Sequence, residues 1–107
     1  MTPRFVHLGI NPVGAVAHMQ PPAAWPENFY ARLEYCFTTH SIDWYRFGSQ
    51  NYVLLTSIGL AELGRLISGL PAFENVYVLL TEMSNIQPPS CNGWMPQQFW
   101  QWLFKAR

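Results

Sequence analysis

The order of strand-like and helix-like segments constrains this chain more than any other feature of its sequence. Short apolar and aromatic runs, typical of strands, alternate with segments whose apolar residues recur at helical spacing. The expected strands are Phe5–Ile10, Ile42–Phe47, Tyr52–Thr56 and Val76–Met83. The expected helices are Pro26–Phe37, one from about Gly59 or Leu60 to Gly69, and a last one that opens at Pro96 and runs to Arg107.

This order predicts a mixed α+β domain. Strand, helix, strand, strand, helix, strand is the pattern of the ferredoxin-like βαββαβ sandwich, and here a C-terminal helix is added to it. In that fold the four antiparallel strands take the order 4-1-3-2, and two helices cover one face of the sheet. The 107 residues are close to the commonest size of a domain, so we expect residues 1–107 to form one domain.

The face of the sheet opposite the two helices needs a cover of its own. Strand residues such as Tyr45 and Leu79 supply apolar groups to both sides of the predicted sheet. Phe99, Trp102 and Leu103 share one face of the last helix. We therefore expect this helix and a second subunit to cover the bare face together.

The shortage of charge points to the same conclusion. Charged residues make up 11% of the chain, whereas 50% of the residues are hydrophobic and 16% are aromatic. A small protein with so few charges tends to hide apolar surface against a partner, which predicts a homodimer. The net charge is zero and no basic run occurs, which argues against nucleic-acid binding.

The sequence carries no sign of a membrane or secretory segment. Thr2, Pro3 and Arg4 lead directly into the first apolar run, unlike a signal peptide. The longest apolar stretch, Val76–Leu80, is too short to cross a bilayer. We expect no membrane contact and a cytoplasmic location, in which the two cysteines stay reduced.

The residue types that carry catalysis show no recognisable spacing. Neither the histidines nor the cysteines match a metal or nucleophile pattern, and His7 is interpreted as a packed or edge side chain of its strand. Asp43 and Glu82 fall on opposite edges of the expected sheet, and Asp43 is expected to pair with Arg46 on its own strand. We predict no catalytic residue, no metal site and no cofactor, which favours a non-enzymatic role.

Two long uncharged loops are the candidates for ligand binding. The first, Asn11–Trp25, is open to a second interpretation, because Val13–Met19 could continue the first strand beyond a bulge. The second is Asn85–Gly93. The candidate ligand-binding residues in and beside these loops are His18, Met19, Trp25, Cys91 and Trp94. They form a pocket for a small apolar or aromatic ligand only if the loops meet over one face; the alternative is that both loops wrap the sheet and seal the dimer.

The stretch from Trp44 to Leu103 contains the segments WYRFGSQNYVLLT, LAELGRLISGL and VYVLLTEM, and Gly93-Trp94 precedes a Trp-rich helix. In this pattern the chain resembles small proteins related to the CRISPR adaptation endonuclease and its stand-alone cousins. The resemblance implies the ferredoxin-like fold. In that family a carboxylate at the end of the first strand binds metal, whereas here that strand ends in Gly9-Ile10-Asn11. The resemblance therefore implies the fold and not the nuclease activity.

The leading functional prediction is a small dimeric binding or interaction module. Two alternatives stay open. One is a metal-dependent nuclease-like enzyme, and the other is a product of a mobile gene cassette that binds a host-specific protein partner.

Overall fold

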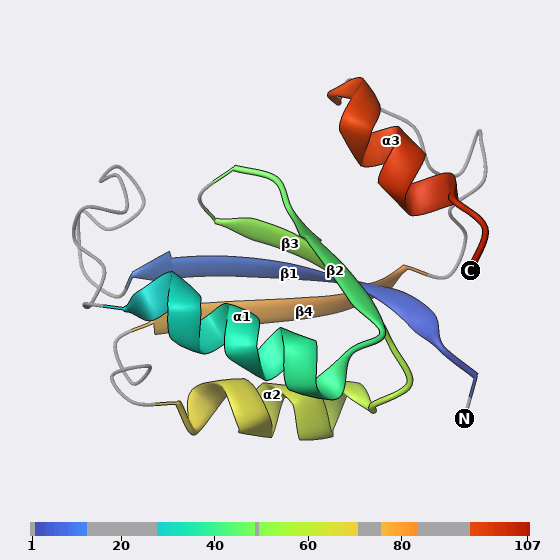
Figure 1. Cartoon of the computed structure of the whole chain (residues 1–107). Coiled ribbons are helices and arrows are strands. Elements are labelled where there is room, and N and C mark those ends of the chain that lie inside the picture. Colours follow the sequence, from blue (N-terminus) through green and yellow to red (C-terminus); the bar gives the residue numbers. More distant parts are fainter. Residues whose placement is uncertain (1, 13–27, 49, 71–75, 84–94) are drawn as a thin grey trace.

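The computed structural model describes residues 2–12, 28–48, 50–70, 76–83 and 95–107. Strands and helices follow one another in the predicted order, which confirms the mixed α+β class (Figure 1). The strands are β1 (Arg4–Pro12), β2 (Asp43–Arg46), β3 (Asn51–Thr56) and β4 (Val76–Met83). The helices are α1 (Phe29–His40), α2 (Leu60–Ser68) and α3 (Gln97–Phe104).

The four strands form one antiparallel sheet in the order β2-β3-β1-β4. β1 lies inside the sheet, where His7 is opposite Val53 of β3 and Thr81 of β4. Because side chains alternate along a strand, these three residues share one face of the sheet. Val6 and Leu8 point to the other face and are completely buried.

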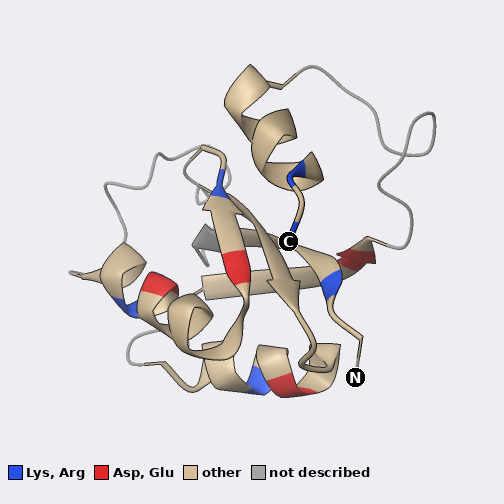
Figure 2. Ribbon diagram, turned by 45° about the vertical axis from the view of Figure 1, so that its right-hand side comes forward, with Lys and Arg blue, Asp and Glu red and all other residues tan. Residues whose placement is uncertain are grey.

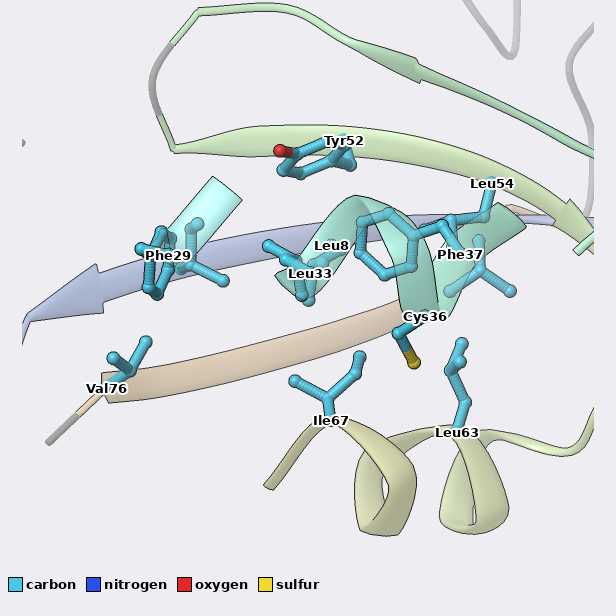
Figure 3. Packing of buried hydrophobic residues seen from close by; sticks show 12 residues of the cluster. Leu8, Phe29, Leu33, Cys36, Phe37, Tyr52, Leu54, Leu63, Ile67 and Val76 are labelled. Carbon is cyan, nitrogen blue, oxygen red and sulfur yellow. The ribbon is translucent and has the colours of Figure 1, made fainter. Parts of the chain in front are cut away.

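Helices α1 and α2 cover that second face, and the main core lies beneath them (Figure 3). The periodic residues that predicted the helices are the residues that they bury. α1 contributes Phe29, Leu33, Cys36 and Phe37. α2 contributes Leu63 and Ile67. Helical spacing therefore identified the core-facing side of both helices correctly.

Both α1 and β1 extend past the ends that the sequence predicted. α1 continues past Phe37 to His40, and within this last turn the hydroxyl of Thr39 donates to the Tyr35 carbonyl at 2.8 Å. β1 continues past Ile10 to Pro12, paired with β4 throughout. The predicted helix start at Pro26 and the alternative strand Val13–Met19 lie outside the described residues.

Helix α3 lies on the opposite side of the sheet from α1 and α2 (Figure 1). It buries Phe99 and Leu103 against Val53, which confirms that the C-terminal helix covers the face opposite α1 and α2. The helix ends at Phe104, before the predicted end at Arg107, because Lys105 has an extended backbone. Of the helices within the described ranges, none has the length and apolarity needed to cross a membrane.

Candidate functional site

The site starts from the side chains that β1 places on the face covered by α3, hereafter the α3 face. Alternation puts Phe5, His7 and Gly9 on this face. Phe5 packs in the cluster beneath the helix. Gly9 contributes no side chain, and a Cβ at that position would meet no atom of the described residues within 4 Å. The α3 face is therefore filled at Phe5 and open at Gly9.

Helix α3 closes the filled part with aromatic side chains. Phe99 meets Tyr45 and Phe47 edge-on, with ring centroids 5.7 and 5.5 Å apart. Trp100 packs edge-on against Phe99 at 5.1 Å and stays partly exposed. Each such pair is worth on the order of 1 kcal/mol beyond the area that it buries. These contacts hold the helix at a defined position over the sheet.

A cleft of about 540 Å³ lies between α3 and the sheet. Its volume is within the range of small-molecule sites, roughly 300–1,000 Å³. Apolar and aromatic side chains dominate its walls, and none of the described residues that line it is charged. The lining residues are His7, Phe47, Asn51, Val53, Thr81, Met83, Met95, Phe99 and Trp100.

The polar groups of the cleft gather on its sheet side. His7 Nε2 lies 3.0 Å from Asn51 Oδ1. The imidazole also stacks on Phe47, with ring centroids 5.8 Å apart and an angle of 28° between the planes. The two contacts fix the orientation of the ring. When Nε2 donates to Asn51, Nδ1 of the neutral ring is a hydrogen-bond acceptor. Thr81, exposed and next to His7 in the register, adds a hydroxyl.

Residues after α3 fasten the helix to β2. Lys105 Nζ and Arg107 Nη2 each lie 3.2 Å from Asp43 Oδ2. The Arg107 guanidinium also lies over the Trp102 ring, 4.8 Å from its centroid, and donates to the Trp102 carbonyl at 2.8 Å. These two basic residues therefore do more than balance the charge of a helix C-terminus.

The predicted ion pair between Asp43 and Arg46 is wrong. The two residues are three positions apart on a strand, so their side chains leave opposite faces of the sheet. Arg46 instead lies 3.3 Å from Glu34 of α1. Burial of the Asp43 carboxyl acts to raise its pKa, but the nearby Trp102 indole and the hydrogen bonds of its other partners outweigh burial and lower the pKa. The indole N–H itself makes no hydrogen bond at ordinary distance within the described residues.

Glu34 joins a second polar cluster, on the α1 side of the sheet. The Tyr52 hydroxyl donates to Glu34 Oε2 at 2.6 Å, and Arg46 approaches the same oxygen. Burial first, and then the hydrogen bond and charge of Glu34, raise the pKa of Tyr52. Because these groups bind one another, we assign the cluster a structural role.

Positive charge does not gather on one face of the described chain (Figure 2). Most basic side chains lie beside a carboxylate, either on another element or one turn away on the same helix. The pairs are Arg4 with Glu82, Arg46 with Glu34, Arg65 with Glu62, and both Lys105 and Arg107 with Asp43. Nucleic-acid binding relies on a basic surface of a kind that these pairs do not form.

The described residues contain no group of three His, Cys, Asp or Glu side chains that could hold a metal ion. Cys36 is buried in the main core, and burial raises the pKa of its thiol, which disfavours the nucleophilic thiolate. Asp43 on β2 and Glu82 on β4 occupy the two edges of the sheet, as predicted.

The ligand-binding residues that the sequence predicted are not tested by the structure, because His18, Met19, Trp25, Cys91 and Trp94 all lie outside the described residues. The sequence interpretation set His7 aside as a packed or edge side chain, and did not single out Asn51 or Thr81. One feature of the sequence could have indicated His7: it alternates with Phe5 and Gly9 along the strand, and these positions fall on the face of the predicted sheet that α1 and α2 do not cover.

Comparisons with protein-family models, with curated proteins and with solved structures found no significant match. The functional argument therefore rests on the geometry and chemistry of the cleft.

Proposed function

We propose that this chain is a non-catalytic binding module, and that the cleft between α3 and the sheet holds a small apolar molecule with an aromatic ring. The observation that carries the proposal is the combination of a volume of about 540 Å³ with a lining that is mostly apolar. Small-molecule sites usually have apolar walls with a few convergent polar groups. An ionic ligand would lose its hydration here without gaining a charged partner among the described lining residues.

The lining also suits an aromatic ring in particular. Phe47, Phe99 and Trp100 offer ring faces and edges, and Met83 and Met95 are flexible enough to adapt to a ligand's outline. A bicyclic ring that buries about 250 Å² of apolar surface gains roughly 6 kcal/mol, before the cost of association. Because the cost of association takes several kcal/mol from this gain, we expect dissociation constants of about a millimolar or weaker for simple ring compounds.

The test is a calorimetric titration with 1-naphthol, using one variant that blocks the cleft and one that does not. Thr81 is exposed at the cleft, so Thr81→Trp fills the space without disturbing the core. Gln101 is exposed on α3 and does not line the cleft, so Gln101→Trp is the matched control. We expect binding to the wild type and to Gln101→Trp and its loss in Thr81→Trp. Equal binding to all three proteins would place the site elsewhere, and no binding to the wild type would refute the proposal.

The ferredoxin-like arrangement is part of the proposal. Read from the other edge, the strand order is β4-β1-β3-β2, and each pairing is antiparallel. This order and the two helices on one face support a βαββαβ sandwich in which α3 is the added C-terminal helix. An experimental structure with β1 at an edge of the sheet would contradict it.

We also propose that two copies associate through β4. Tyr77 and Leu79 of this edge strand are 62% and 66% exposed, although both are large and apolar. An edge strand presents unpaired backbone groups, which the identical strand of a second copy can meet across a two-fold axis. The low charge of the chain, 11% of its residues, supports the same partner.

A further inference from the structure

We infer that the ligand of this cleft is an uncharged aromatic compound with a hydrogen-bond donor, such as a phenolic hydroxyl or a ring N–H, and that His7 accepts that hydrogen bond. The inference rests on the proposed function and narrows its ligand class. Three features support it: the order of residues along the cleft, the orientation of His7, and the absence of a charged partner in the described lining.

The register of the sheet shows the order of the residues along the cleft, from an apolar end beneath α3 to an open end. Met83 lies opposite Phe5, in the cluster beneath α3. Thr81 lies opposite His7, one step further along the same face. The next position on this face of β1 is Gly9, above which the described part of the chain leaves open space. An aromatic ring that enters beneath α3 therefore leaves its polar substituent beside His7 and Thr81.

The imidazole of His7 is held ready for that substituent. Its Nε2 is engaged by Asn51 at 3.0 Å, and its ring is stacked on Phe47. Neither contact uses Nδ1, which accepts a hydrogen bond when Nε2 carries the proton. Because the ring is already oriented, a ligand donor meets an acceptor that loses little conformational freedom on binding.

The charged side chains of the strands and of the residues after α3 are paired with one another. Lys105 and Arg107 both bind Asp43, Arg46 binds Glu34 on the α1 side of the sheet, and Arg4 binds Glu82. A ligand carboxylate would find no cation among the described lining residues, and a ligand ammonium would find no carboxylate there. A hydroxyl or N–H needs neither, which makes a neutral donor the best match.

Three probes of similar shape separate the possibilities. 1-Naphthol carries a donor, 1-methoxynaphthalene keeps the oxygen without the donor, and 1-naphthoate carries a negative charge. Each is titrated calorimetrically into the wild type, into His7→Phe and into His40→Phe. The first substitution keeps a ring to stack on Phe47, and the second removes a histidine on α1 that does not line the cleft.

We expect the wild type to bind 1-naphthol about tenfold more tightly than either other probe, as one hydrogen bond predicts. In His7→Phe the preference over 1-methoxynaphthalene should fall to within about twofold, and in His40→Phe it should be unchanged. Equal wild-type affinities for 1-naphthol and 1-methoxynaphthalene, or tighter binding of 1-naphthoate, would overturn the inference and leave the proposed function standing. These wild-type comparisons hold even if His7→Phe fails to fold. Failure of all three probes to bind would refute the proposed function and the inference with it.

Discussion

Arg107 and Asp43 join α3 to β2, with Arg107 Nη2 lying 3.2 Å from Asp43 Oδ2. The same guanidinium packs over the rings of Trp102 and Phe5. One side chain thus contacts the helix, the central strand β1 and the edge strand β2. Because α3 forms one wall of the cleft, the contact between these two residues also supports the candidate site.

The ion pair makes the attachment of α3 sensitive to acid. The folded state lowers the pKa of Asp43, so its ionised form stabilises the fold above the unfolded pKa of roughly 4. This stabilisation is lost as the pH falls through the lowered pKa of the folded state. We expect the difference in melting temperature between the wild type and Asp43→Asn to be present at neutral pH and to shrink as the pH falls below about 4, through the lowered pKa of Asp43. A difference that stays constant with pH would show that the charge of Asp43 does not hold the helix.

We predict that the packing of α3 against the sheet contributes to the stability of the folded protein. Leu103 is 1% exposed against the sheet, so Leu103→Ala should lower the free energy of unfolding by about 2–4 kcal/mol. Phe104 of the same helix is 43% exposed, and Phe104→Ala should cost less than about 1 kcal/mol. Denaturant unfolding measures both values.

Removal of residues 96–107 should cause aggregation, and a soluble truncated protein with an unchanged melting temperature would contradict this prediction.

Self-association through β4 can be tested by adding one charge to its exposed apolar surface. Leu79→Lys places a charge on an edge strand, which opposes strand pairing between copies. Ile42, 60% exposed beside β2, provides the control Ile42→Lys. Light scattering at micromolar concentration should show a dimer for the wild type and for the control, and a monomer for Leu79→Lys. A monomeric wild type would exclude the dimer.

Metal-dependent cleavage of DNA or RNA is not expected. β1, which reads RFVHLGINP, contains no carboxylate, and the described residues contain no group of three His, Cys, Asp or Glu side chains that could hold a metal ion. Incubation of the protein with nucleic acid and Mg²⁺ or Mn²⁺ should leave the substrate intact. Cleavage that is lost in a folded Asp43→Asn or Glu82→Gln variant would show that this expectation is wrong.

Periodic and local features of the fold were predictable from the sequence. Leu63 and Ile67 mark the buried side of α2, and Val76–Met83 is the strand β4 with the predicted bounds. In α2 the spacing of these apolar residues places them on one side of the helix, and the folded protein buries that side. The bare face of the sheet and its C-terminal helix were predictable for the same reason.

The cleft could not be predicted, because it depends on register between distant segments. His7 and Asn51 are 44 positions apart, and only the pairing of β1 with β3 brings them within hydrogen-bond distance. The partner of Asp43 was missed for a similar reason, since Arg107 reaches it only after α3 has crossed the sheet. Local spacing contains no information about such contacts.

The most direct test of the account is an NMR titration that observes the methionine methyl groups. Met83 and Met95 line the cleft from β4 and from the residues before α3. With methyl-labelled methionine, and with Met83→Leu and Met95→Leu to assign the signals, 1-naphthol should shift both resonances through its ring current. The half-maximal shift should fall at the dissociation constant measured by calorimetry. If neither resonance moves when the calorimetric binding is saturated, the ligand does not bind between α3 and the sheet, and the account is wrong.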